Sequence, residues 1–239
     1  MTVAVSTASA ITQIQSVLPV AYEYRIEIAF VSIALITVAN LRGLRESGNI
    51  FAVPTYLFVG LALLIVWLGG FRIVTGTAGA VAPQPNAVPF GSEVLGVFLI
   101  LKAFAGGSVA LTGVEAIANG VPAFKPPEAR NAANTMTAMA ILLGVLFIGL
   151  TIVAVNFGLR PTEAGGKSIV ALAAATVFGA DSPLFVAFAG STALILFLAA
   201  NTSFNAFPRL AAILAEDGYM PRQFSFRGDR LAYSWGIVL

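Results

Sequence analysis

Long apolar runs separated by short polar segments dominate the chain, and few charges interrupt them. A helix that crosses a bilayer needs about 20 consecutive, mostly apolar residues. Six runs approach or exceed this length: 2–20, 27–40, 50–68, 94–124, 136–157 and 184–207. A seventh run starts at 231 and extends to 239. The pattern therefore predicts an all-α integral membrane protein with about six transmembrane helices plus a truncated seventh.

Shorter elements are expected between these spans. The run 168–178 is too short to cross and is interpreted as an interfacial or loop helix. Prolines 126–127 followed by Glu128 are typical of a helix start, so we expect a short amphipathic helix before the fifth span. Residues 210–217 are expected to form a helix that Gly218 closes. No linker separates domains, and we interpret residues 1–239 as a single transmembrane domain.

Composition supports the membrane class and excludes several functions. The chain is 58% hydrophobic and 10% charged, with a mean hydropathy of +0.91, whereas about a quarter of the residues of soluble domains are charged. It has no cysteine and no histidine, which leaves oxygen atoms as the ligands for any bound ion. A net charge of +2 is too small to indicate nucleic acid. No phosphate-binding loop, cofactor motif or nucleophile motif occurs, so we expect neither an enzyme nor a cofactor.

Basic residues in the loops predict the orientation of the spans, because short cytoplasmic loops carry the excess of Lys and Arg. One set of alternating loops holds eight basic residues, among them Arg42, Arg130 and Arg222. The opposite set holds four: Arg25, Arg72, Arg160 and Lys167. We therefore expect the first set to face the cytoplasm, the first span to run outward and the fourth span to run inward.

Glu115 is the most informative residue, since it lies inside the fourth apolar run. A carboxylate at membrane depth costs at least about 2.5 kcal/mol and typically marks an ion or substrate path. The run 94–124 has 31 residues, and as one helix it would extend about 46 Å across a hydrocarbon core of about 30 Å. We therefore expect a broken helix, with Thr112 and Glu115 supplying oxygen atoms at the break. The glycines that would permit it are Gly106, Gly107 and Gly113.

The alternative for this span is a glycine-rich packing face, with Glu115 paired to Lys102. Thr2 and Ser6 are four residues apart and share one face of the first helix, with Gln13 close to the same line. Hydroxyls in membrane helices usually bond to their own helix or a neighbour, so spacing alone is weak evidence for a ligand role. The polar cluster 201–205 is interpreted as interhelical hydrogen bonding near the cytoplasmic end of the sixth span.

Three segments carry a resemblance to a known family. The segment 110–134 reads ALTGVEAIANGVPAFKPPEARNAAN and resembles the sixth transmembrane helix and following loop of the amino acid-polyamine-organocation (APC) permease superfamily. The segment 200–210, ANTSFNAFPRL, with DGYMPR at 217–222, is similar to the end of its eighth helix. The segment 40–48, NLRGLRESG, resembles the loop before its fifth helix.

Within the superfamily, the likeness is closest to KimA-type potassium importers of bacteria, which couple import to protons. Thr2 and Ser6 match the last two residues of that family's third-helix pattern, and Thr112 and Glu115 match its sixth-helix site. The resemblance implies that these four residues line a potassium path, with Glu115 a candidate for charge compensation or proton coupling. It also implies a LeuT-like inverted-repeat transporter, of which the chain would cover the third helix to the start of the ninth.

We therefore expect a fragment of a secondary active transporter that imports potassium with protons by alternating access. The alternative within the class is an amino acid permease, and the alternative outside it is a truncated remnant that transports nothing. The expected location is the bacterial plasma membrane, as a multi-pass protein in contact with membrane lipid. The full-length protein is a candidate homodimer.

Overall fold

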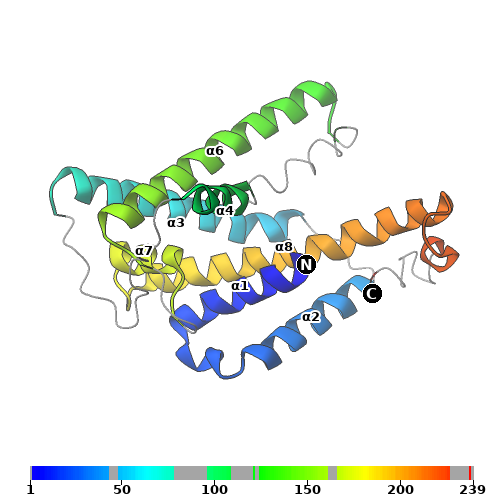
Figure 1. Cartoon of the computed structure of the whole chain (residues 1–239), viewed down its shortest axis with the longest axis horizontal. Helices are drawn as coiled ribbons and strands as arrows, with labels where there is room; N and C mark the ends of the chain where they lie inside the picture. Colours follow the sequence, from blue (N-terminus) through cyan, green and yellow to red (C-terminus); the bar gives the residue numbers. More distant parts are fainter. Residues whose placement is uncertain are drawn as a thin grey trace. The chain divides into compact units, whose positions relative to one another are not determined.

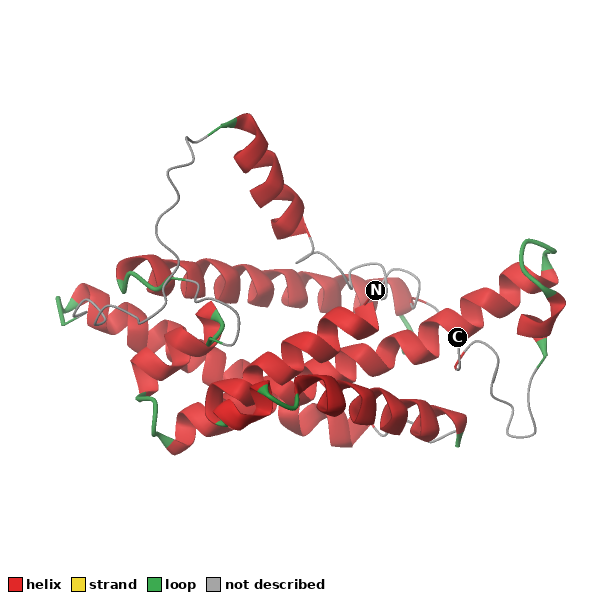
Figure 2. Ribbon diagram, turned by 60° about the horizontal axis from the view of Figure 1, so that its bottom comes forward, coloured by secondary structure: helices red, strands yellow, loops and turns green. Residues whose placement is uncertain are grey.

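The computed structural model of the chain describes residues 2–42, 48–77, 96–108, 121, 124–160, 166–226 and 237, and every structural statement below concerns these residues. Their secondary structure is helical throughout, as Figures 1 and 2 show. The elements are α1 (Thr2–Val17), η1 (Pro19–Tyr22), α2 (Arg25–Leu41), α3 (Gly48–Val74), α4 (Val97–Ser108), α6 (Glu128–Asn156), α7 (Ile169–Phe178), α8 (Pro183–Glu216) and η4 (Arg222–Ser225). The all-α prediction is confirmed for the described part of the chain.

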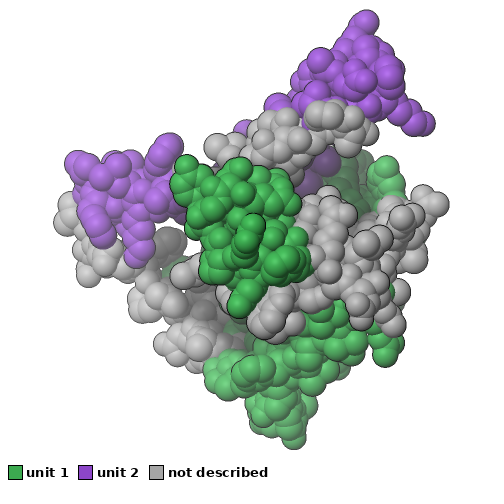
Figure 3. All heavy atoms as spheres, turned by 90° about the vertical axis from the view of Figure 1, so that its right-hand side faces the viewer, with its two compact units in different colours: residues 1–87, 153–239 green, residues 88–152 purple. Residues whose placement is uncertain are grey.

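The chain forms two compact units, coloured separately in Figure 3. The first comprises residues 1–87 and 153–239, and the second comprises residues 88–152. α1, α2, α3, α7 and α8 belong to the first unit, whereas α4 and most of α6 belong to the second. Each unit is described by itself.

α8 is the central helix of the first unit, where it packs against α1, α2, α3 and α7. Small residues line these contacts, because alanine lets two helix backbones approach closely. Among the buried residues are Ala10 on α1 and Ala189, Ala193 and Ala200 on α8. Phe188 of α8 is fully buried and stacks on Phe58 of α3, with 5.7 Å between the ring centroids. The core of this unit therefore lies along α8.

Three described helices are long and apolar enough to cross a membrane: Ala52–Val74, Glu128–Asn156 and Pro183–Phe204. They correspond to the third, fifth and sixth predicted spans. The first and second predicted spans form shorter helices of 16 and 17 residues, and α4 has 12 residues. The membrane class is supported, and the full set of six spans stays a prediction. The predicted seventh span lies outside the described residues, except for Ile237.

Two predicted boundaries were wrong. Glu128 does begin a helix, but no separate short helix precedes the fifth span, since α6 is one helix of 29 residues. Residues 128–139 contain no proline or glycine, so nothing interrupts helix propagation there. The helix expected at 210–217 is the end of α8, which continues through Pro208. Gly218 follows with a φ of +82°, as expected for a glycine that closes a helix.

The short helix predicted at 168–178 is confirmed as α7. The Ser168 hydroxyl caps it by accepting a hydrogen bond of 3.1 Å from the backbone N–H of Ala171. Gly179 follows the last turn with a φ of +93°, in the left-handed region that glycine tolerates best. Arg72 at the end of α3 donates to the carbonyl of Thr176 at 3.1 Å, which ties α7 to α3.

Candidate functional site

Thr2 and Ser6 lie in the first two turns of α1. Ser6 is buried at 9% exposure, whereas Thr2 is exposed. Their spacing of four residues places them on one face of the helix, about 6 Å apart along its axis. Hydroxyl oxygens bind an alkali cation only weakly on their own, so two of them form at most part of a site for potassium.

Further buried polar residues occupy the same helix: Thr7, Gln13 and Ser16. The hydroxyl of Ser16 donates to the carbonyl of Thr12 at 3.0 Å, the bond to the same helix that such side chains usually make. The amide of Gln13 donates to Ser168 Oγ at 2.9 Å, so it joins α1 to the cap of α7. Thr7 Oγ1 and Gln13 Oε1 have no hydrogen-bond partner among the described residues.

Thr7 is the residue that sequence reasoning missed. It is 1% exposed and immediately follows Ser6, but a threonine in an apolar run gives no sign of which way it faces. A buried hydroxyl without a partner costs about 1–3 kcal/mol, and such groups call for an explanation such as a bound water or ion. Thr7 therefore joins Thr2 and Ser6 as a third oxygen-bearing residue in the first half of α1.

The residues predicted in the fourth span are only partly described. Gly106 and Gly107 lie near the end of α4 and are exposed, and a Cβ added to either would meet nothing within 4 Å among the described residues. No described side chain packs against these two glycines, and the glycine-rich packing face stays an alternative. Thr112, Gly113 and Glu115 lie outside the described residues, so the broken helix stays a prediction.

The four predicted site residues come from two segments of the chain, and only the segment with Thr2 and Ser6 is described. Thr2 and Ser6 belong to the first unit, and the segment that holds Thr112 and Glu115 belongs to the second. Their convergence on one site stays a prediction, as does the pairing of Glu115 with Lys102. Within the described ranges, no group of three or more histidine, cysteine or acidic residues could hold a metal ion.

An asparagine pair joins the end of α2 to the middle of α8. Asn40 Nδ2 donates to Asn201 Oδ1 at 2.6 Å and also to the carbonyl of Ile36 at 2.8 Å. Thr202, the next residue of the cluster, donates to the carbonyl of Leu198 at 3.1 Å. Interhelical bonding was the interpretation of the cluster 201–205, and for Asn201 it is confirmed.

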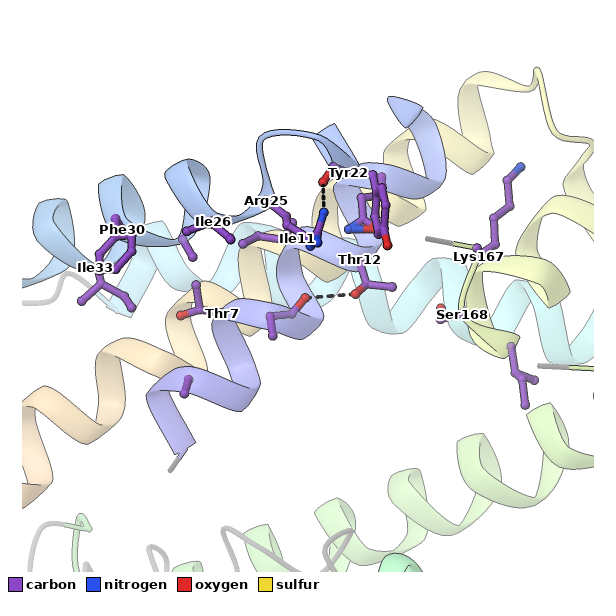
Figure 4. Close-up of a pocket in the computed structure, with 16 residues that line it drawn as sticks. Thr7, Ile11, Thr12, Tyr22, Arg25, Ile26, Phe30, Ile33, Lys167 and Ser168 are labelled. Atoms are coloured by element: carbon purple, nitrogen blue, oxygen red, sulfur yellow. Dashed lines mark hydrogen bonds between the residues drawn. The ribbon is translucent and has the colours of Figure 1, made fainter. Parts of the chain in front are cut away.

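A groove of about 650 Å³ separates α1 from α2 in the first unit, and Figure 4 shows the side chains that line it. Residues 166–169, which lead into α7, close one end. Arg25 and Lys167 both line this groove, and Arg72 is bonded to α7. Three basic residues that were predicted to face the same side of the membrane thus lie at one end of the first unit.

Comparisons with known proteins extend over the whole chain. The family described as amino acid permease matches residues 1–239. The potassium transporter KimA of Bacillus subtilis (strain 168) is 46% identical over 240 residues. That alignment covers 100% of this chain and 39% of the relative. The chain thus spans well under half the length of the curated relative it matches.

Proposed function

The chain belongs to the amino acid permease family, and on that premise we propose that it is part of a proton-coupled potassium importer that works by alternating access. The family is one of transporters, not enzymes. The proposal rests chiefly on the 46% identity over the entire chain to a protein named as a potassium transporter. A bacterial plasma membrane is the location that this relative supports, with the full-length protein a candidate homodimer.

The proposed site draws its oxygen atoms from two segments of the sequence. In this proposal, α1 supplies the oxygen atoms of Thr2 and Ser6, and the segment after α4 supplies Thr112 and Glu115. Oxygen atoms replace the hydration shell of potassium, and exposed carbonyls at a helix break are one source of them. The carboxylate of Glu115 balances the charge of the cation, or carries the coupled proton when no cation is bound.

The buried hydroxyls of α1 provide the physical support from the described residues. Ser6 and Thr7 are both buried, and Thr7 Oγ1 lacks a hydrogen-bond partner within the described part of the chain. An oxygen without a donor is costly in a membrane domain but suits contact with a cation or its water. These residues lie in the first half of α1, where the proposed site needs oxygen atoms.

Potassium uptake by the full-length protein that contains this chain, in a strain that depends on potassium import, tests the proposal. Glu115→Gln and Thr112→Val are expected to reduce uptake about tenfold or more, because each removes an interaction with a charged group. Matched controls are Glu128→Gln, at the exposed start of α6, and Thr202→Val, whose hydroxyl bonds to its own helix. Expression and membrane insertion are measured for every variant.

The outcomes separate the site from the substrate. If the parent supports potassium uptake but both site variants match their controls, the assignment of Glu115 and Thr112 is wrong. If the parent transports no potassium but takes up a labelled amino acid, the second candidate replaces the first. That candidate is favoured by the description of the matching family as amino acid permease. If no solute is transported, the remnant hypothesis takes its place.

A further inference from the structure

The groove between α1 and α2 changes character along its length. α1 and α2 are joined by the short η1 and run back along each other, so the lining residues form two facing stripes. On α2 they follow helical spacing, since Ile26, Ala29, Phe30 and Ile33 share one face. At the η1 end the lining is polar instead and includes Thr12, Gln15, Tyr22, Arg25 and Ser168. The groove is therefore polar at one end and mainly apolar beyond it.

The charge at the polar end has one sign. Arg25 and Lys167 line the groove, and none of its lining residues is acidic. The guanidinium of Arg25 lies 4.3 Å above the ring of Tyr22 and donates to the carbonyl of Tyr22 at 2.8 Å, which holds it in place. That bond uses one of its five N–H donors. In Figure 4, Arg25 and Tyr22 lie at the end of the groove away from Phe30 and Ile33. The ammonium of Lys167 leans toward Phe185, 4.8 Å from the ring centroid.

We propose that this groove binds an anionic phospholipid, with the phosphate at Arg25 and one acyl chain along the apolar stripes of α1 and α2. Arginine binds phosphate through paired, charge-assisted hydrogen bonds, whereas the side chain of Lys167 extends away from Arg25 in Figure 4. Tyr22 and Tyr24 lie where α2 begins, as is typical of aromatic side chains at the membrane interface. Thr7 also lines the apolar part of the groove, so the proposed lipid would lie beside that hydroxyl, whereas the positive charge of Arg25 makes the polar end unfavourable for potassium. This inference does not depend on which solute is transported.

Native mass spectrometry of the purified full chain, with phosphatidylglycerol and phosphatidylcholine of identical acyl chains, tests the proposal. We expect phosphatidylglycerol to be retained preferentially, and Arg25→Gln to reduce its retention about tenfold. Arg25→Lys, which keeps the charge, should retain part of the preference. Arg130→Gln is the matched control, because Arg130 is exposed on α6 and remote in sequence from the groove.

A second pair of variants tests the position of the acyl chain. Ala29→Trp places a large ring in the groove and is expected to reduce retention of both lipids. Ala34→Trp, on the same helix but not among the residues that line the groove, should leave retention unchanged. Equal retention of the two lipids by the parent would overturn the proposal, as would equal effects of Arg25→Gln and Arg130→Gln. A stable dimer that carries no lipid, and that Ala29→Trp but not Ala34→Trp dissociates, would assign the groove to a second copy and overturn the proposal.

Discussion

Replacing Gly69 by alanine is expected to destabilise the first unit, because a side chain at this position of α3 would meet Val153 at the end of α6. An alanine Cβ at this position would lie 2.6 Å from Val153 Cγ2 and 3.2 Å from Val153 Cγ1. Carbon atoms pack best at about 3.5–4.0 Å, so the nearer contact is about 1 Å too short. Val153 is 1% exposed, and its β-branched side chain has little freedom to rotate away.

Gly70 provides a matched control in the next position of the same helix. A Cβ at Gly70 would meet nothing within 4 Å among the described residues. Glycine to alanine in a helix stabilises by about 0.5–1 kcal/mol through backbone entropy, and both variants gain this term. Overpacking costs about 1–3 kcal/mol and applies only at Gly69. We therefore expect the unfolding free energies of the two variants to differ by about 1–3 kcal/mol, with Gly70→Ala the more stable.

Equilibrium unfolding in mixed micelles, followed by circular dichroism, measures this difference. The double variant Gly69→Ala with Val153→Ala should be more stable than the sum of the two single changes predicts, because the second change removes both clashing methyl groups. Equal stability of Gly69→Ala and Gly70→Ala would refute the packing argument. Strict additivity in the double variant would refute the assignment of the clash to Val153.

Two further predictions concern hydrogen bonds that join helices. In a double-mutant cycle of unfolding, Asn40→Ala and Asn201→Ala should show a coupling energy of about 0.5–1 kcal/mol, since each removes the same 2.6 Å bond. A coupling energy of zero would show that this bond contributes nothing to stability. Ser168→Ala should destabilise by about 0.5–1 kcal/mol more than Ser182→Ala. Both serines cap a helix, but only Ser168 also accepts from the amide of Gln13, and equal losses would contradict that second role.

The apolar runs predicted where helices lie better than where they end. α3, α6 and α8 coincide with long runs because a helix that crosses a bilayer must be both long and apolar. The separate short helices expected before the fifth span and after the sixth were wrong, because a change from apolar to polar residues marks the surface of a membrane and does not by itself end a helix. The two ends of α7 have physical causes, since the Ser168 side chain caps its start and Gly179 follows its last turn with a positive φ.

The candidate site was predictable only where neighbours in sequence share a helix. The spacing of Thr2 and Ser6 places them on one face, but the burial of Thr7 depends on where α8 lies. In a soluble protein, the apolar stripe of a helix indicates its buried face. In a membrane protein, lipid and protein core are both apolar, so the pattern does not distinguish the face toward lipid from the face toward the core. The bond between Asn40 and Asn201 joins residues 161 positions apart, and a single sequence carries no signal for such a pair.

Ser6 lies on a different face of α1 from most of the residues that line the groove, whereas Thr7 is buried and lines the groove as well. Ser6, Ala10 and Gln13 are buried and follow a helical spacing of four and three residues. Ala4, Ala8 and Ile11 line the groove with the same spacing, displaced by two positions. Two positions correspond to about 200° around an α-helix, so the two stripes lie on nearly opposite sides. A lipid in the groove would therefore reach Ser6 only if α1 moved as a whole. Loss of lipid binding in Arg25→Gln should accordingly leave the affinity for potassium unchanged.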